Sequence, residues 1–264
     1  MSLSTVLFLF LAHLAVGIAF TLMLVSGEAG IKFFRFNSGL AAILLIIGIA
    51  FRPADAPRDL AWIALLVAAA ALVLYWATIG RALTRIRTAI MGVAAAAGTL
   101  ALVLQALALS ADRATGMRAL TIASFLTSAG LLGGACTAMI LGHWYLILPS
   151  MQVSHLQSIV KVHIISMVLR VVVVAAAVLM AIMTWQPGLG PSFRHYILSS
   201  GGIFFWQRVL FGLFGPALLS YLTWETAKIR STQSATGILY VDFFTVVVGE
   251  VLAKYLLLAT RVPV

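Results

Sequence analysis

The sequence predicts an all-α polytopic membrane protein, a bundle of eight transmembrane helices with short loops that forms a single domain over residues 1–264. Three observations predict this class. Hydrophobic residues make up 63% of the chain and charged residues only 9%, whereas soluble domains carry about 25% charged residues. The mean hydropathy is +1.12. Finally, the apolar residues fall into eight long runs separated by short charged segments. A chain of this kind needs lipid as its solvent.

The eight runs predict the membrane helices in order, because a bilayer core about 30 Å thick requires roughly 20 apolar residues as helix. They comprise residues 3–25, 36–51, 60–80, 88–110, 119–142, 162–185, 201–224 and 237–260. The second run is short, and Phe33, Phe34 and Phe36 at its start are typical of a membrane interface. The longest segments between runs are 143–161 and 186–200, the latter rich in Pro and Gly. No internal repeat is evident in the sequence.

Small residues predict which helices pack most closely. The fifth run contains Gly130 and Gly134 in a GxxxG pair, within a stretch rich in Ala and Gly. Small residues let helix backbones approach one another in lipid, so this helix is expected near the centre of the bundle. In the seventh run, Pro216 follows Gly212 and Gly215 and predicts a kink.

Basic residues indicate the orientation rather than a nucleic-acid partner. The formal net charge is +10, but most basic residues lie between apolar runs, where they contact lipid headgroups and set topology. Eight helices put both termini on one side, called side A. Basic residues on the opposite side, side B, are Lys32, Arg35, Arg81, Arg85, Arg87, Lys161, Lys228 and Arg230. Those on side A are Arg52, Arg58, Arg113, Arg118, Arg194 and Arg261. Eight against six favours a cytoplasmic side B and periplasmic termini in a bacterial inner membrane.

Charged residues inside the seventh and eighth runs predict a buried ionic cluster. Arg208 lies in the seventh run, and Glu250 and Lys254 lie four residues apart on one face of the eighth. All three fall roughly 9 to 15 Å below side A at 1.5 Å per residue. A charge inside a span costs about 2.5 to 3.5 kcal/mol on the insertion scale. The cluster is expected either to neutralise itself as a structural contact or to carry an ion, a proton or an anionic substrate.

Aromatic residues and histidines at side B predict a ligand pocket. His143, Trp144 and Tyr145 end the fifth run, His163 begins the sixth, and Asp242 lies near the start of the eighth. We expect these side chains to line one pocket, because convergent polar groups between aromatic walls are typical of ligand sites. His143 and His163 are candidate axial ligands of a haem iron. The alternative is an interfacial belt that turns the same side chains toward headgroups.

Arg170, about nine residues from side B in the sixth run, is expected to belong to the same pocket. The sixth run offers no acidic partner, and Asp242 lies at a compatible but shallower depth, so Arg170 is a candidate to hold a carboxylate, a haem propionate or a quinone headgroup. The alternative is that backbone carbonyls cap it or that it reaches the interface. His13, near the middle of the first run, is more typical of a hydrogen bond between helices than of a metal site.

Three functions fit these patterns. The first is a membrane subunit of a bacterial respiratory system that binds quinone, haem b or both and associates with other subunits. The second is a small ion-coupled secondary transporter or channel, built on Arg208, Glu250 and Lys254. The third is a membrane scaffold or assembly factor that binds no ligand. The sequence contains no nucleotide-binding, zinc-protease or nucleophile-elbow motif, so any energy must come from an ion gradient, a lipid-soluble carrier or a partner.

Overall fold

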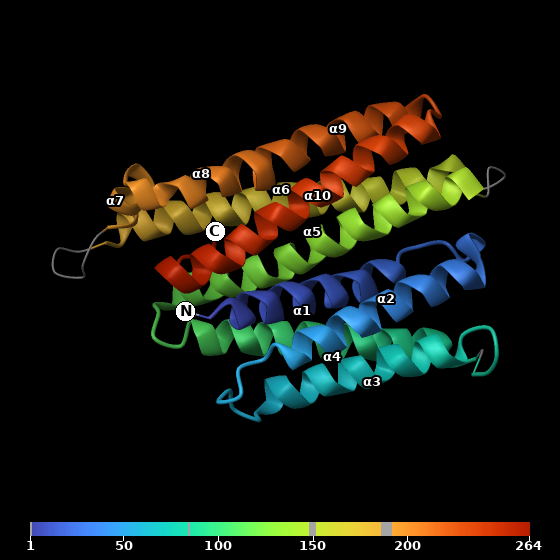
Figure 1. Cartoon of the computed structure of the whole chain (residues 1–264), viewed down its shortest axis with the longest axis horizontal. Coiled ribbons are helices and arrows are strands. Elements are labelled where there is room, and N and C mark those ends of the chain that lie inside the picture. Colours follow the sequence, from blue (N-terminus) through green and yellow to red (C-terminus); the bar gives the residue numbers. More distant parts are fainter. Residues whose placement is uncertain (1, 84, 148–151, 186–191) are drawn as a thin grey trace.

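A computed structural model describes residues 2–83, 85–147, 152–185 and 192–264. Within these residues, eight helical spans are long and apolar enough to cross a membrane, and no strand occurs. The spans lie side by side along the long axis of the molecule (Figure 1). The all-α, multi-pass membrane class predicted from the sequence is therefore confirmed.

The seventh span differs from the others because it is interrupted. Two short helices, α8 and α9, are joined by a π-helical turn, η3, and a short α7 precedes them. In chain order the elements are α1 (Leu3–Leu22), η1 (Gly27–Ala29), α2 (Gly30–Ala50), α3 (Leu60–Thr78), α4 (Arg87–Leu109), α5 (Thr115–Ile147), α6 (Val153–Met183), α7 (Phe193–Leu198), η2 (Ser200–Gly202), α8 (Ile203–Val209), η3 (Leu210–Phe214), α9 (Gly215–Lys228) and α10 (Thr232–Thr260).

Several helices extend beyond their predicted apolar runs. α5 continues to Ile147 and α6 already begins at Val153, so the expected loop over 143–161 is wrong for its described residues. Hydropathy detects the part of a helix that lies in hydrocarbon, whereas the helical backbone continues through polar residues at the interface. Residues 148–151, and 186–191 of the other long loop, lie outside the described residues.

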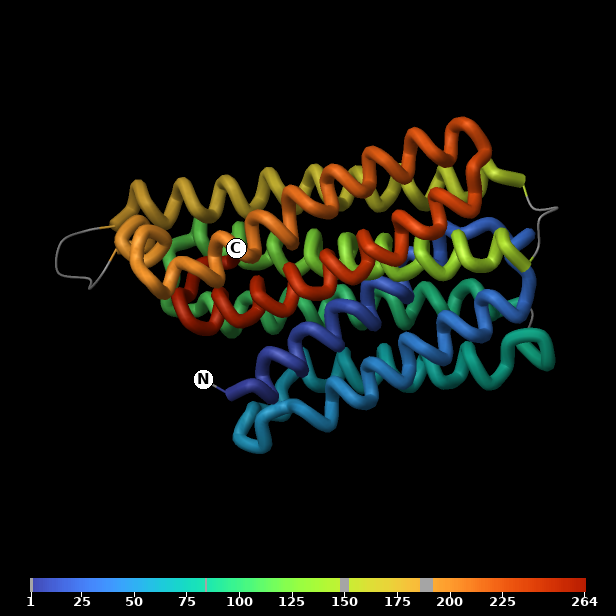
Figure 2. Tube along the Cα trace, turned by 45° about the horizontal axis from the view of Figure 1, so that its top comes forward, coloured from blue at the N-terminus to red at the C-terminus, as the bar shows by residue number. Residues whose placement is uncertain are grey.

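The eight spans form two units of four helices each. In the first unit α1 packs on α2, α2 on α3, α3 on α4, and α4 back on α1. In the second unit α5, α6, the seventh span and α10 make the same ring of contacts in the same order. Both views place the first unit on one flank and the second on the other (Figure 2). The arrangement is a parallel repeat that the sequence alone did not reveal.

The two units meet where α1 crosses α5. Gly17 and Gly133 bring the two backbones into direct contact, since a Cβ on Gly133 would lie 2.1 Å from the carbonyl carbon of Gly17. One turn further along each helix, the hydroxyl groups of Thr21 and Thr137 are 2.7 Å apart. The pairs Gly17/Gly133 and Thr21/Thr137 have the same sequence separation, so the junction is itself part of the repeat.

The GxxxG pair of α5 serves a different contact. A Cβ on Gly130 would lie 3.3 Å from the Ser166 hydroxyl oxygen, and one on Gly134 would lie 3.3 Å from the His163 Cα. Both glycines therefore face α6. With Gly133 on its other side against α1, α5 is enclosed by neighbours, as expected for the central helix.

Candidate functional site

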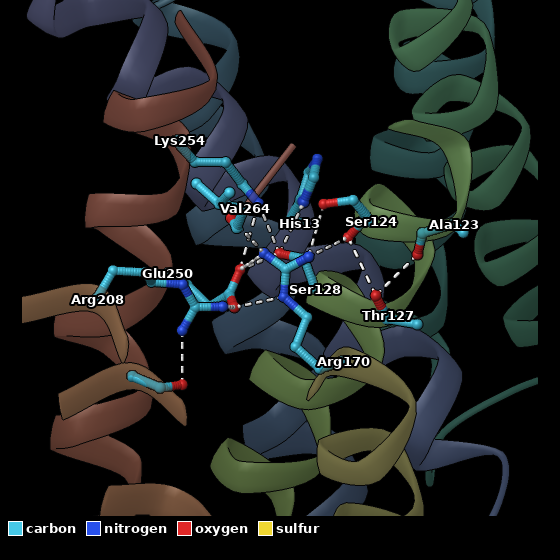
Figure 3. Close-up of polar contacts among 11 residues, drawn as sticks. His13, Ala123, Ser124, Thr127, Ser128, Arg170, Arg208, Glu250, Lys254 and Val264 are labelled. Carbon is cyan, nitrogen blue, oxygen red and sulfur yellow. Dashed lines mark hydrogen bonds and ion pairs between the residues drawn. The ribbon is translucent and has the colours of Figure 1, made fainter. Parts of the chain in front are cut away.

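Glu250, in α10, is the centre of a buried ionic network inside the second unit (Figure 3). Its Oε1 accepts from Nε of Arg170 at 2.9 Å and from Nη2 of Arg208 at 2.8 Å. Its Oε2 is 3.2 Å from Nη2 of Arg170 and 3.4 Å from Nζ of Lys254. Arg170, Arg208 and Glu250 are fully buried, and Lys254 is 2% exposed. One carboxylate thus holds three cationic side chains from three helices.

Ser128, on α5, connects this network to α1. Its hydroxyl donates to Oε2 of Glu250 at 2.5 Å and accepts from Nζ of Lys254 at 2.6 Å. Nδ1 of His13 lies 3.1 Å from the same hydroxyl oxygen. Because the single hydroxyl hydrogen goes to Glu250, Nδ1 of His13 must be the donor in this contact. The network therefore reaches the helix at the junction of the two units.

Arg170 is held from its other side as well. Its Nη1 donates to the Ser124 hydroxyl at 2.6 Å and to the Ser124 carbonyl at 3.2 Å. Its Nη2 also donates to the Val264 carbonyl at 3.3 Å. Val264 reaches this position because Arg261 adopts a left-handed conformation, with φ 59°, and turns the chain back after α10. Val264 is itself buried, so the turned segment covers the network on the side of the termini.

The interruption of the seventh span positions Arg208. Pro216 has no N–H to donate to the Gly212 carbonyl four residues earlier, and Nη1 of Arg208 donates to that carbonyl at 2.6 Å. The turn between α8 and α9 is π-helical at this point. Gly212 and Gly249 allow the two spans to touch, since a Cβ on Gly249 would lie 2.2 Å from the Gly212 Cα. The kink predicted at Pro216 thus has a specific structural consequence.

A second buried pair of ionisable side chains lies on α6 and α10, the helices that carry Arg170 and Glu250, and it is closer to side B. Nε2 of His163 in α6 is 2.6 Å from Oδ2 of Asp242 in α10, and both side chains are fully buried. The contact lacks the alignment of a hydrogen bond, and Nδ1 of His163 and Oδ1 of Asp242 find no hydrogen-bond partner among the described residues. The pair is therefore a close contact of ionisable groups with unused hydrogen-bonding capacity.

The two ionic sites form a column along α6 and α10. Asp242 and Glu250 are eight residues apart on α10, about 12 Å at 1.5 Å per residue, and His163 and Arg170 are seven apart on α6. Buried Met167 and Val246 lie between them on the same helices. A short apolar layer thus separates the side-B pair from the network around Glu250.

The structure brings the predicted cluster of Arg208, Glu250 and Lys254 together. It also places Arg170 in this cluster, although Arg170 was a candidate for the side-B pocket with Asp242 among its candidate partners. Arg170 contacts Glu250 instead. The reason is the early start of α6 at Val153, which puts Arg170 near the middle of the helix rather than close to side B.

The other residues of the predicted pocket do not converge. Nδ1 of His143 is 3.1 Å from the Tyr240 hydroxyl, and Nε1 of Trp144 donates to the Ala29 carbonyl at 3.1 Å. The hydroxyl of Tyr145 donates to the Gln152 carbonyl and accepts from the Leu156 N–H. Consecutive residues of a helix point about 100° apart, so these three side chains meet different neighbours. His143 is exposed, whereas His163 is buried.

The structure places the two predicted haem ligands, His143 and His163, apart from each other, each beside another partner. Gly134 lies against His163, and His143 is nine residues further along the same helix, about 13 Å. Nε2 of His163 already faces Asp242. Across the described residues, no three His, Cys, Asp or Glu side chains are grouped so that they could hold a metal ion.

Some polar contacts were not predicted. Ser124 and Ser128 give no sequence signal, because serine is common in membrane helices as a packing residue. His13 was expected to hydrogen-bond between helices, and its partner is now Ser128. Nε2 of His155 and Oε2 of Glu28 are 2.7 Å apart, linking the start of α6 to η1. This pair joins segments distant in sequence, which no local pattern indicates.

The fold and the site together define an integral membrane protein, a helical bundle with a buried ionic network in its second four-helix unit. Comparisons of the chain with models of protein families, with curated proteins and with solved structures found no match.

Proposed function

We propose that this protein is a proton-coupled secondary transporter of a small anion, with Glu250, Arg170 and Arg208 as its binding site. One observation supports this proposal above all: a single carboxylate of the protein, that of Glu250, binds the guanidinium groups of both Arg170 and Arg208. Guanidinium groups bind carboxylates and phosphates through paired N–H donors. A substrate anion with such oxygens is therefore chemically equivalent to what Glu250 presents.

The coupling follows from charge balance. Glu250 occupies N–H donors of both Arg170 and Arg208, and its charged carboxylate repels a second anion that approaches the same donors. If Glu250 takes up a proton, it no longer competes for Arg170 and Arg208, and an anion can replace it. One proton and one monovalent anion together are neutral, so the charge of the network stays constant when both enter; a divalent anion would need a second proton for the same balance. This links anion binding to protonation of Glu250.

The pair of His163 and Asp242 is the proposed entry for the proton from side B. Histidine is the side chain that changes charge most readily near neutral pH, and Asp242 at 2.6 Å can exchange a proton with it. Met167 and Val246 lie between this pair and Glu250. In this mechanism the apolar layer must admit water or shift before a proton reaches the network, which prevents an uncoupled leak.

Two features of the fold support transport over a static role. Many secondary transporters are built from repeated units and place their site near the bilayer midplane at interrupted helices. Here the two four-helix units form a parallel repeat, and the π-helical turn of the seventh span adjoins Arg208. π-Helical turns are frequent at functional sites.

The experiment is uptake into proteoliposomes. The purified protein is reconstituted, and labelled phosphate, sulfate, monocarboxylates and dicarboxylates are offered outside at acidic pH, with a pH-sensitive dye inside. We expect one of these anions to accumulate together with internal acidification, and a protonophore to stop the accumulation. Glu250→Gln should abolish proton-driven accumulation but keep exchange of the anion across the membrane, because its arginines are free while its proton site is lost.

Glu225→Gln is the matched control. Glu225 is half-exposed and, among the described residues, forms its ion pair with neighbouring Lys228 at the side-B end of α9, so its removal should leave uptake unchanged. Uptake that is equal in wild type and Glu250→Gln, or absent for every anion with no proton movement, contradicts the proposal.

Quinone or haem b binding in a bacterial respiratory complex is the second candidate. It is supported by the exposed imidazole of His143 at the side-B end of α5, next to Trp144, where a quinone carbonyl could approach. An absorption spectrum and solvent extraction of the purified protein test this reading. A scaffold without ligand is the third, and it expects no uptake and no cofactor. For all three we propose a bacterial inner membrane with side B cytoplasmic, on the eight-to-six distribution of basic residues.

A further inference from the structure

Two grooves on the outside of the bundle share one design. The first, about 430 Å³, lies between α6 and α9 and is lined by Lys161, Ile165, Val168 and Trp224 among others. The second, about 450 Å³, lies between α2 and α3. Its lining residues are Lys32, Arg35, Phe36, Gly39, Leu40, Ile43 and Trp76. One groove belongs to each four-helix unit, and in both cases it is formed by the second and third spans of that unit.

In both grooves the lining residues of the second span follow one helix face, with a lysine nearest side B. Lys32, Phe36 and Gly39 of α2 have the same spacing as Lys161, Ile165 and Val168 of α6. Each groove ends at side B against a tryptophan near the end of the following span. The lining sequences are otherwise dissimilar, but a basic residue, an apolar wall and a tryptophan occur in both grooves.

In both grooves a cationic group lies against the tryptophan ring. Nζ of Lys161 is 5.2 Å from the centre of the Trp224 ring, and Cζ of Arg35 is 5.8 Å from that of Trp76. In the second groove, Gly39 lets the ring lie directly on α2, since a Cβ there would be 2.8 Å from Nε1 of Trp76. Tryptophan and basic side chains are the usual anchors at the level of lipid headgroups.

We propose that the two grooves are paired binding sites for anionic phospholipids of the side-B leaflet. The apolar wall of each groove faces the lipid phase and suits an acyl chain. The basic residues at its side-B end suit a phosphate with net negative charge, and no Asp or Glu is among the residues that line either groove. A zwitterionic headgroup would bring its own cation toward these basic residues and is disfavoured. This inference does not depend on the transported substrate.

Native mass spectrometry of the full-length protein tests the proposal by counting lipids. The protein is released from detergent after incubation with phosphatidylglycerol or with phosphatidylcholine of the same acyl chains. We expect two retained phosphatidylglycerol molecules, one for each groove, and weaker retention of phosphatidylcholine. One phosphatidylglycerol should be retained by each of two double variants, Lys161→Gln/Trp224→Phe and Lys32→Gln/Arg35→Gln. The variant that combines all four substitutions should retain none.

Arg85→Gln is the matched control, because Arg85 is an exposed basic residue on the same side that lines neither groove. This variant should still retain two phosphatidylglycerol molecules. Thermal unfolding confirms that each variant is folded. If Lys161→Gln/Trp224→Phe does not fold, Lys161→Ala alone replaces it as the variant of the first groove. Equal retention of both lipids, or unchanged stoichiometry in the groove variants, overturns the proposal. A protein dimer lost in the groove variants, or a retained quinone in place of lipid, overturns it as well by assigning a different occupant.

Discussion

Glu250 is the residue on which the buried network depends. Arg170, Arg208 and Lys254 all contact its carboxylate, and Ser128 donates to it. Burying a charge in a membrane protein is costly unless partners compensate it. Removing Glu250 would leave three cationic groups without their shared partner, whereas removing any one cation leaves the carboxylate paired.

We therefore expect Glu250→Gln to be the most destabilising single change in the network. Breaking a buried pair typically costs about 3 to 5 kcal/mol because the remaining charge is stranded. Arg208→Gln/Glu250→Gln should recover part of that loss. Thermal unfolding in detergent measures both variants, and a double variant equal to the sum of the singles would mean that the two side chains do not interact.

Ser128 provides a second test at this scale, because its hydroxyl contacts Glu250, Lys254 and His13 together. Ser128→Ala leaves buried polar groups with one partner fewer, at a cost of about 1 to 3 kcal/mol. Ser158→Ala is the control, since the exposed Ser158 donates to a carbonyl of its own helix and, among the described residues, to no other group. Equal unfolding temperatures for the two variants would argue against an organising role for Ser128.

The interrupted seventh span is the element that carries Arg208 into the network. Its π-helical turn, the missing N–H of Pro216 and the contact of Gly212 with Gly249 act together. The Gly212 carbonyl, which Pro216 leaves without its usual helical donor, is thus free to accept from Arg208. The local break is thus the structural condition for placing a guanidinium group beside Glu250.

Two glycines of α10 test this arrangement. Gly249→Ala should destabilise the protein and displace Arg208, because the new Cβ would meet the Gly212 backbone at 2.2 Å. Gly237→Ala has open space around it and should be neutral or stabilise α10 by up to about 1 kcal/mol, as usual for Gly to Ala in a helix. Both are measured by thermal unfolding. A Gly249→Ala protein as stable as Gly237→Ala would show that the spans do not approach so closely.

At the scale of the whole molecule, the two units differ in the side chains that they bury. The first unit is mostly apolar inside, and the buried ionic side chains Arg170, Arg208, Asp242, Glu250 and Lys254 all belong to the second. The units meet at Gly17 and Gly133, where backbone touches backbone. His13 extends the ionic network across this junction. A movement between the units would therefore change the hydrogen bonds of Ser128 and, through it, those of Glu250.

We expect the units to associate when expressed as separate chains divided in the loop before α5, for example after Asp112. Co-purification of the tagged first unit with the second measures this association. Gly133→Ala should weaken it, because a Cβ there would lie 2.1 Å from Gly17. Gly92→Ala, where nothing lies within 4 Å, should not. Equal recovery with both variants would mean that the junction does not hold the units together.

The sequence was sufficient for the membrane class and for the contact of Arg208 with Glu250, because hydropathy and depth along a helix depend only on local composition. It was not sufficient for Arg170, whose depth depends on where α6 begins, and hydropathy does not detect a helix that continues through polar residues. It also did not reveal the repeat, since the corresponding helices share positions such as Gly17 and Gly133 rather than extended sequence. The separation of His143 from His163 likewise required the three-dimensional arrangement of α5, α6 and α10.

Competition between Glu250 and a substrate anion for the same arginines can be measured through the effect of anions on thermal stability. Wild type and Glu250→Gln are unfolded in detergent with phosphate, sulfate or a dicarboxylate against chloride at equal ionic strength, over a range of pH. A ligand that binds the folded state raises its stability in proportion to RT ln(1 + [L]/Kd). We predict a larger stabilisation of Glu250→Gln than of wild type at neutral pH, with the wild-type effect growing as the pH falls and the gain lost in Arg170→Gln/Glu250→Gln. Equal effects of the anions on wild type and Glu250→Gln at every pH would show that the carboxylate of Glu250 does not compete with an anion.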